Sequence, residues 1–185
     1  MPFSEKLQIL KEISLKECQH AFAEIDAIAE KNTLKVLEAM RAARVSDAHF
    51  NVTSGYAYDD IGRTKLEELY AAVFGAEAAL VRTQFVSGTH ALATVLFGIL
   101  RPGDELLSVT GAPYDTMQTV IGYENPTPGS LKEFGILYDE VAMKDGKADL
   151  AAIERKIRPE TKMVLIQRSR GYSMRDPLSH EEIQE

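Results

Sequence analysis

Between residues 105 and 167 the sequence alternates segments that fit strands with segments that fit helices, and this alternation constrains the fold more than any other feature. The hydrophobic pattern predicts strands over 105–109, 135–141 and 163–167, and helices over 114–121 and 150–157. Strands that follow one another through helical crossovers lie parallel in one sheet. The predicted fold class is therefore α/β, with a mostly parallel sheet flanked by helices.

A second feature is the turn before a helix that the apolar spacing predicts from about residue 88 to 100. An apolar segment at 78–81 fits a buried strand, and Ser87, Gly88 and Thr89 follow it. The first amides of a helix have no intrahelical partner and carry the positive end of its dipole, so a phosphate is favoured there. The two hydroxyls could add donors. Taken alone, however, Ser-Gly-Thr before a helix is more often only an N-cap and a tight turn.

Composition excludes several classes of protein. The 185 residues are 45% hydrophobic, which is enough for one domain or most of a larger one. A net charge of -7 without a Lys or Arg cluster argues against a nucleic-acid partner. The sequence has neither a membrane-spanning stretch nor a signal-peptide core, so we expect a cytoplasmic protein without a membrane partner.

The cysteine and histidine content narrows the chemistry further. The single cysteine, Cys18, excludes an internal disulfide, and its place in a helical pattern predicts a small buried side chain. The four histidines lack metal-ligand spacing, so no metal site is expected. His90 is the one histidine next to the proposed phosphate turn.

Residues 4–44 are predicted to form a helix, because apolar residues recur at helical spacing along most of this segment. The stripe consists of Leu7, Leu10, Cys18, Phe22, Ile25, Ile28, Leu34, Leu37 and Met40. The pair Asn32-Thr33 could divide this helix in two. An extended helical arm needs a surface to cover, either on its own subunit or on a second one. We therefore separate an N-terminal helical arm, 1–48, from the remainder, 49–185.

Between the arm and the phosphate turn, residues 49–64 are polar and aromatic without a regular period, which indicates an ordered loop. Thr64 is then predicted to N-cap a helix, with Glu67 at the capping-box position and Gly75 at the end.

In parallel α/β sheets, ligands collect beyond the carboxyl ends of the strands. Here these ends lead into the loops 82–88, 110–114 and 168–172, which we expect to converge on one crevice. Arg168 and Arg170 place two guanidinium groups in the last loop, where an anion contact is as well supported as surface solubility.

The sequence stops one turn into a predicted helix. Ser179 and Glu182 form a good capping box just before its end. We therefore expect the chain to be the N-terminal part of a longer polypeptide, truncated at its C-terminus, with the partner of the open sheet edge beyond residue 185.

Four motifs in order along the chain carry a resemblance to a known family. They are Gly-Tyr-Ala-Tyr-Asp-Asp-Ile-Gly-Arg at 55–63, Ser-Gly-Thr-His-Ala at 87–91, Leu-Arg-Pro-Gly-Asp at 100–104 and Pro-Tyr-Asp-Thr at 113–116. Together they resemble the methionine gamma-lyase-like, or aluminium-resistance, family of pyridoxal-phosphate (PLP) enzymes, related to cystathionine beta-lyases and gamma-synthases. The resemblance covers nearly the whole chain and favours the phosphate reading of the Ser-Gly-Thr turn over a simple N-cap.

The resemblance implies PLP-dependent fold type I, the aspartate aminotransferase-like architecture, with residues 49–185 as the N-terminal part of the large PLP-binding domain. It also implies a homodimer or homotetramer with shared active sites. Ser87, Gly88 and Thr89 would bind the phosphate of pyridoxal 5'-phosphate. Tyr114 would stack on the pyridine ring and assist proton transfer as a catalytic residue.

The remaining cofactor contacts implied by the resemblance come from the first motif and from residues beyond this sequence. Tyr56 or Tyr58, together with Arg63, would reach the phosphate of a neighbouring subunit. The spacing of Tyr58 and Arg63 departs from the Tyr-x-Arg arrangement of related lyases, which leaves the choice of tyrosine open. The Schiff-base lysine and the aspartate that pairs with the pyridinium nitrogen would lie downstream of residue 185.

For the full-length protein, the resemblance implies a PLP-dependent carbon-sulfur lyase. It would act on a sulfur-containing amino acid, of cystathionine or methionine type, by beta- or gamma-elimination, and the sequence leaves that choice open. Two alternatives remain: a PLP-dependent transferase on the same fold, and a non-catalytic phosphate-binding or oligomerisation module.

Overall fold

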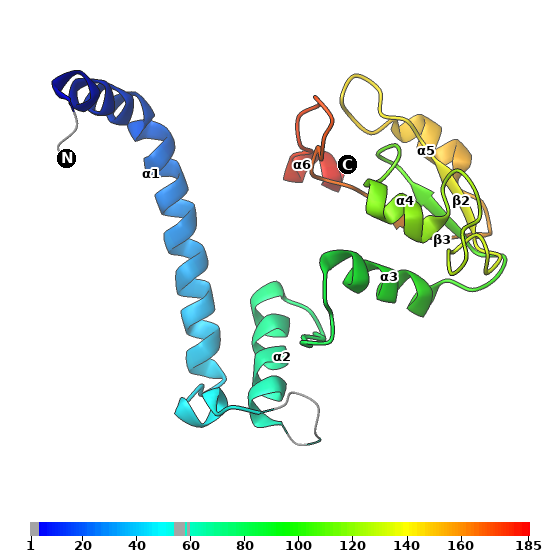
Figure 1. The fold of residues 1–185 in the computed structure, drawn as a ribbon, viewed down its shortest axis with the longest axis horizontal. Helices are drawn as coiled ribbons and strands as arrows, with labels where there is room; N and C mark the ends of the chain where they lie inside the picture. The colour runs from blue at the N-terminus through cyan, green and yellow to red at the C-terminus, as the bar shows by residue number, and fades with distance from the viewer. Residues whose placement is uncertain (1–3, 54–57, 59) are drawn as a thin grey trace. The chain divides into compact units, whose positions relative to one another are not determined.

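The computed structural model describes residues 4–53, 58 and 60–185, and their contacts divide the chain into two compact units. Unit 1 ends at Gln84 and unit 2 runs from Phe85 to Glu185 (Figure 1). The predicted boundary between an arm, 1–48, and a cofactor-binding domain, 49–185, remains a prediction. No helix in the described ranges combines the length and hydropathy needed to cross a membrane.

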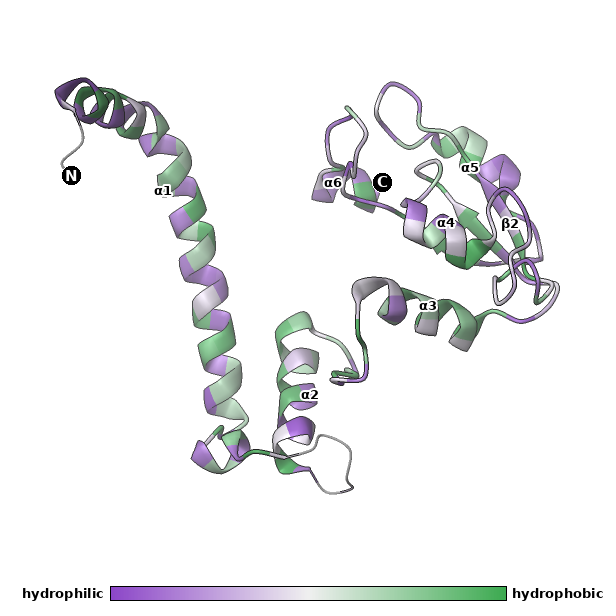
Figure 2. Cartoon of the chain, viewed as in Figure 1, coloured by the Kyte–Doolittle hydropathy of each residue, from purple (hydrophilic) through white to green (hydrophobic). Residues whose placement is uncertain are grey.

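Unit 1 is dominated by one helix, α1 (Glu5–Ala42). The possible division at Asn32-Thr33 is absent, since α1 is continuous through both residues, and the Asn32 side-chain amide donates back along the helix to the carbonyl of Ile28 at 2.9 Å. None of the described α1 residues is buried, and Figure 2 shows apolar and polar residues alternating along the helix. The prediction that Cys18 is buried is wrong: its side chain is exposed, because no described residue covers this part of α1.

The rest of unit 1 contains the 3-10 helix η1 (Asp47–Phe50) and the helix α2 (Ile61–Phe74), which contacts α1. The predicted cap at Thr64 is wrong. The helix begins one turn earlier, because the Asp60 carboxylate accepts from the main-chain N–H of Arg63 at 3.0 Å. The predicted end at Gly75 is confirmed, since this glycine has the left-handed φ of 64° that terminates many helices.

The segment 78–81 does not form the strand that its apolar composition predicted. The main-chain N–H of Val81 donates instead to the Glu67 carboxylate at 3.0 Å, and Glu67 also forms an ion pair with Arg82. A side chain of α2 therefore takes the hydrogen-bonding position that a neighbouring strand would occupy.

Unit 2 follows the predicted alternation of helices and strands. Its elements are α3 (Gly88–Ile99), β1 (Glu105–Ser108), α4 (Asp115–Ile121), β2 (Leu137–Glu140), α5 (Leu150–Lys156), β3 (Thr161–Leu165) and α6 (His180–Gln184). The strand order is β2-β1-β3, and both pairings are parallel. The α/β class and the parallel sheet are thus confirmed. The capping box at the start of α6 is confirmed as well.

The core of unit 2 lies on both faces of β1, in which every residue is buried. Leu106 packs in a cluster with residues of α3 and α4, whereas Leu107 packs in a second cluster against α5. Successive side chains of a strand point to opposite faces, so two adjacent leucines serve two layers of helices. The helices packed on both faces hold the sheet and so position the carboxyl ends of its strands.

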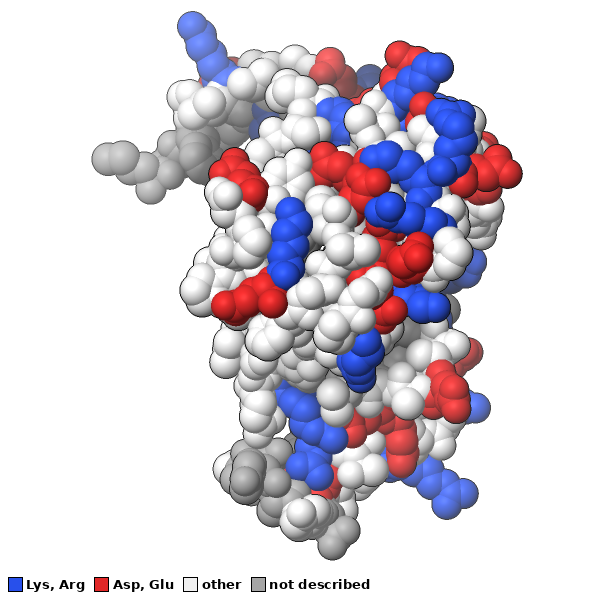
Figure 3. All heavy atoms as spheres, turned by 90° about the vertical axis from the view of Figure 1, so that its right-hand side faces the viewer, with Lys and Arg blue, Asp and Glu red and all other residues white. Residues whose placement is uncertain are grey.

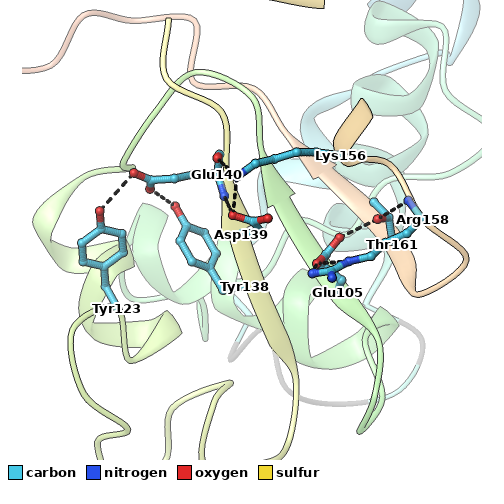
Figure 4. Close-up of polar contacts among 8 residues, drawn as sticks. All are labelled: Glu105, Tyr123, Tyr138, Asp139, Glu140, Lys156, Arg158 and Thr161. Atoms are coloured by element: carbon cyan, nitrogen blue, oxygen red, sulfur yellow. Dashed lines mark hydrogen bonds and ion pairs between the residues drawn. The ribbon is translucent and has the colours of Figure 1, made fainter. Parts of the chain in front are cut away.

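Charged side chains hold the amino-terminal end of the sheet. The carboxylate of Glu105, which is fully buried, accepts from Arg158 Nε at 2.8 Å and from the hydroxyl of Thr161 at 2.5 Å (Figure 4). The hydrogen bonds from Arg158 hold the pKa of Glu105 below its ordinary value. Nearby, Lys156 forms an ion pair with Asp139 at 2.6 Å. On the face in Figure 3, basic side chains lie among acidic ones.

Two phenols share one carboxylate at the end of β2. Tyr138 donates to Glu140 at 2.7 Å and Tyr123 donates to its other oxygen at 3.1 Å (Figure 4). Burial raises the pKa of Tyr138, and the hydrogen bond with Glu140 raises the pKa of Tyr123. Both phenols therefore stay protonated and donate to Glu140, and the bond from Tyr123 joins the loop after α4 to the sheet.

Candidate functional site

The N-terminus of α3 has the features that anion binding requires. Ser87 is the N-cap, and its hydroxyl accepts from the main-chain N–H of His90 at 3.1 Å. Within the described residues, no hydrogen-bond partner is found for the main-chain N–H groups of Gly88 and Thr89. Outside its own helix, no heavy atom lies within 4 Å of the position that a Cβ on Gly88 would take. Two donors and an open approach therefore coincide at the positive end of the helix.

The side chains around this turn hold its shape. The His90 ring accepts from the main-chain N–H of Val86 at 3.4 Å and meets the ring of Phe85 edge-on, with the centroids 5.6 Å apart. The hydroxyl of Thr89 donates to that of Thr116, in the first turn of α4, at 3.2 Å. The main-chain N–H of Thr89 is therefore a donor that remains without a partner among the described residues.

Tyr114 is the N-cap residue of α4 and follows β1 through a short loop. Its main-chain N–H donates to the side-chain oxygen of Gln167 at 3.1 Å, and its phenol oxygen contacts the hydroxyl of Ser169. The phenol is therefore held by residues that follow β3. Since 36% of Tyr114 is exposed, the residue also remains accessible to a ligand.

A hollow of about 460 Å³ opens beside Tyr114. Its lining is mostly apolar and comprises Leu92, Pro113, Tyr114, Met117, Leu165, Ile166, Gln167, Arg168, Ser169 and Pro177. Two of the three predicted loops, 110–114 and 168–172, thus contribute to one crevice at the carboxyl edge of the sheet. The third loop, 82–88, is not in this lining, although the α3 helix that follows it contributes Leu92.

The arginines near the last loop mainly bind main-chain carbonyls. Arg168 donates through Nε to the carbonyl of Leu178 at 2.9 Å, whereas Arg170 is exposed. Arg175, which the sequence analysis did not select, donates at 2.8 Å to the carbonyls of both Gln167 and Ser169. The sequence signals for this loop were its place after a strand and the pair Arg168 and Arg170, and neither signal marked Arg175.

The first motif belongs to unit 1. Tyr56 lies outside the described residues, and Tyr58 is 96% exposed. Arg63 is half-buried in the first turn of α2 and lines a second hollow, of about 830 Å³, together with Asp60. Hydrogen bonds from the main-chain N–H of Arg63 and the hydroxyl of Thr53 lower the pKa of Asp60. The carboxylate is therefore ionised at neutral pH and fixes the start of α2.

The arrangement of unit 2 indicates the class of protein, and the comparison with known families then indicates the family. Unit 2 is an α/β structure with a parallel sheet and helices on both faces. Proteins of this class usually bind ligands at the carboxyl edge of the sheet, the edge near which Tyr114 lies here. A family model described as methionine gamma-lyase matches residues 7–185. The chain therefore belongs to the methionine gamma-lyase family, and the resemblance stated from its motifs is confirmed.

Several relatives and solved structures are similar to this chain. The uncharacterized protein YnbB of Bacillus subtilis (strain 168) is 51% identical over 164 residues, which are 88% of this chain and 39% of YnbB. A solved Listeria innocua protein, provisionally named a cystathionine beta-lyase involved in aluminum resistance, has 49% identity and a TM-score of 0.92. A carbon-sulfur lyase involved in aluminum resistance from Clostridium novyi NT has 48% identity and a TM-score of 0.89.

These matches cover nearly all of this chain but less than half of its relatives. The two solved structures align with 98% of this chain, which spans 45% of the Listeria chain and 44% of the Clostridium chain.

Proposed function

We propose that the protein carrying this chain is a pyridoxal-phosphate-dependent carbon-sulfur lyase. It would eliminate a sulfur-bearing group from an amino acid of cystathionine or methionine type, at the beta or the gamma carbon. Membership of the methionine gamma-lyase family supports this class of reaction, as does similarity to a protein named a carbon-sulfur lyase. The observation that carries the proposal is the pair of main-chain N–H groups, at Gly88 and Thr89, that the described residues leave without a partner.

The residues of this chain fit a phosphate ester with an aromatic ring. The N–H groups of Gly88 and Thr89 suit phosphate oxygens, and the open surface at Gly88 allows a close approach. The Ser87 hydroxyl, whose oxygen accepts from His90, can still donate its own proton to the same phosphate. Tyr114 lines a hollow that can take a ring against its phenol.

Each of these residues would contribute one element of the mechanism. When bound, the cofactor supplies an electron sink for a carbanion on the substrate. The α3 terminus would anchor the phosphate and so set the position of the ring. The Tyr114 phenol, in contact with the Ser169 hydroxyl, can hold or pass a proton at its oxygen. The mostly apolar lining of the hollow would limit the access of water to the reacting atoms.

Other parts of the proposal come from the family alone. Tyr56 or Tyr58, with Arg63, would serve the phosphate of a neighbouring subunit in a homodimer or homotetramer. The Schiff-base lysine and the pyridinium-pairing aspartate would lie beyond residue 185. These roles remain predictions.

Absorption spectroscopy tests the cofactor assignment. The whole protein that carries this chain should gain a visible absorption band with pyridoxal phosphate, and borohydride should remove it. Ser87→Asp keeps an N-cap for α3 but adds a negative charge next to the phosphate, and we expect it to weaken cofactor binding about tenfold or more. Ser179→Asp makes the same change at the cap of α6 and should leave cofactor binding unchanged.

The outcomes separate the alternatives. A folded protein whose spectrum does not change with pyridoxal phosphate would refute the enzyme assignment and favour a phosphate-binding or oligomerisation module. Release of a ketoacid and ammonia from cystathionine or methionine would distinguish a lyase from a transferase on the same fold. Equal cofactor affinity in Ser87→Asp and Ser179→Asp would show that the α3 terminus is not the phosphate site.

A further inference from the structure

The side chain of Gln167 lies at the centre of the hydrogen bonds around Tyr114. Its oxygen accepts from the main-chain N–H of Tyr114 at 3.1 Å, and its nitrogen donates to the carbonyl of Ser169 at 3.2 Å. The hydroxyl of Ser169 contacts the phenol oxygen of Tyr114. These three contacts link the main-chain N–H of Tyr114 to its own phenol through the side-chain amide of Gln167 and through Ser169.

The main chain of Gln167 is held as firmly as its side chain. Its N–H donates to the hydroxyl of Thr110, a buried residue after β1, at 2.9 Å. Its carbonyl accepts from Arg175 at 2.8 Å, and the same guanidinium nitrogen also reaches the carbonyl of Ser169 at 2.8 Å. All four polar groups of Gln167 therefore have partners, which leaves its amide only one orientation that satisfies them.

The loop after β3 also approaches the Tyr114 ring directly. A Cβ placed on Gly171 would lie 2.9 Å from the ring carbon Cε1 of Tyr114 and 3.4 Å from the amide nitrogen of Gln167. Gly171 has a left-handed φ of 57°, so both its backbone conformation and this close approach favour glycine. The ring thus has the Gly171 backbone against one of its edges and the Ser169 hydroxyl at its tip.

We propose that Gln167 is a positioning residue that fixes the orientation of the Tyr114 phenol, with Arg175 holding the loop on which this depends. Its catalytic consequence rests on the proposed function, because it acts through Tyr114 rather than on a cofactor or substrate. The backbone of Tyr114 comes from the end of β1 and Ser169 from the end of β3. Gln167 therefore links the segments that follow β1 and β3, and the orientation of the Tyr114 side chain depends on both segments.

Hydrogen exchange tests the positioning role without any cofactor. In the whole protein, Gln167→Met removes both side-chain bonds, whereas Gln167→Glu keeps an oxygen that can accept from the Tyr114 N–H. We expect exchange at the Tyr114 amide to become about fivefold faster in Gln167→Met and to stay near the wild-type rate in Gln167→Glu. The amide of Leu107 in β1 reports global opening, and Gln184→Met, in α6, is the matched control. Unchanged exchange in Gln167→Met would overturn the inference.

A double-mutant cycle tests the consequence for catalysis. Gln167→Met should lower kcat/KM for elimination about tenfold, and in a Tyr114→Phe background less than about twofold, because the phenol that Gln167 orients is then missing. Equal losses in both backgrounds would contradict a role through Tyr114. If Gln167→Met does not fold, Ser169→Ala replaces it in the cycle, with the same expected loss of effect in Tyr114→Phe. A wild-type protein without a borohydride-sensitive band would refute the proposed function, while the exchange experiment would still decide the positioning role.

Discussion

The two units of this chain reach order by different means. In unit 2, all four residues of β1 are buried, and its two leucines pack into separate clusters on opposite faces of the sheet. In unit 1, α1 extends over 38 residues without a single buried one. Unit 2 therefore illustrates stability from tertiary packing, whereas within this chain α1 depends on helix propensity and local hydrogen bonds.

The same contrast separates the candidate site residues. Those of unit 2 are placed by contacts between residues far apart in sequence, such as Tyr114 with Gln167 and Thr89 with Thr116. Those of unit 1 are placed by neighbours in sequence, as Arg63 is by Asp60. Contacts between residues far apart in sequence depend on the folded sheet, so loss of the unit 2 core should also disorder its candidate site.

Replacing a buried leucine gives the largest expected difference between the units. Leu106→Ala removes a side chain with 0% exposure from the centre of the sheet and should lower the free energy of unfolding by about 2–5 kcal/mol. Ile25→Ala changes an α1 residue that is 60% exposed and should alter stability by less than about 0.5 kcal/mol. Chemical denaturation of the whole protein measures both changes. A large loss in Ile25→Ala would show that another surface covers α1.

The Glu105 carboxylate gives the next largest effect, and its effect depends on pH. Its pKa is lower in the folded protein than the ordinary value of 4.5, so its contribution to stability is present above pH 4.5 and is lost as the pH falls through the folded pKa. Glu105→Gln should therefore cost about 2 kcal/mol at pH 7. Because Arg158 is half exposed, solvent screening keeps the loss moderate.

Denaturation curves at several pH values check this prediction. The difference between wild type and Glu105→Gln should shrink as the pH is lowered below 4.5. Glu154→Gln, at an exposed position of α5, makes the same chemical change and should have little effect at any pH. A cost of Glu105→Gln that stays constant down to acid pH would mean that packing, rather than the ion pair with Arg158, holds this end of the sheet.

Much of unit 2 could be predicted from sequence because its signals are local. The spacing of the apolar residues predicted α3 and the alternation of strands and helices. Ser87 was predicted from its place just before the start of α3. The family motifs selected Tyr114, which the structure places at the carboxyl edge of the sheet. The partners of Tyr114 could not be predicted in the same way, since Gln167 lies 53 residues further along the chain.

Unit 1 was predicted less well because its local signals compete with one another. The apolar segment 78–81 resembles a strand, but the Glu67 carboxylate takes the N–H of Val81. Thr64 and Glu67 fit a capping box, but Asp60 caps the helix earlier and Glu67 pairs with Arg82 instead. In both places the Glu67 carboxylate has more than one possible partner, and the spacing of residues in the sequence does not indicate which partner it binds.

Asn32 gives the smallest effect and tests whether α1 depends on local energetics. Asparagine in the middle of a helix is less favourable than alanine, even when its amide bonds back to the helix, as it does to Ile28. Asn32→Ala should raise the free energy of unfolding of α1 by about 0.5 kcal/mol, whereas Ala27→Gly, at an exposed position of the same helix, should lower it by about 1 kcal/mol. Circular dichroism during thermal unfolding measures both. If Asn32→Ala instead destabilised the protein, the Asn32 amide would have to make a contact outside its own helix, and α1 could no longer be treated as locally stabilised.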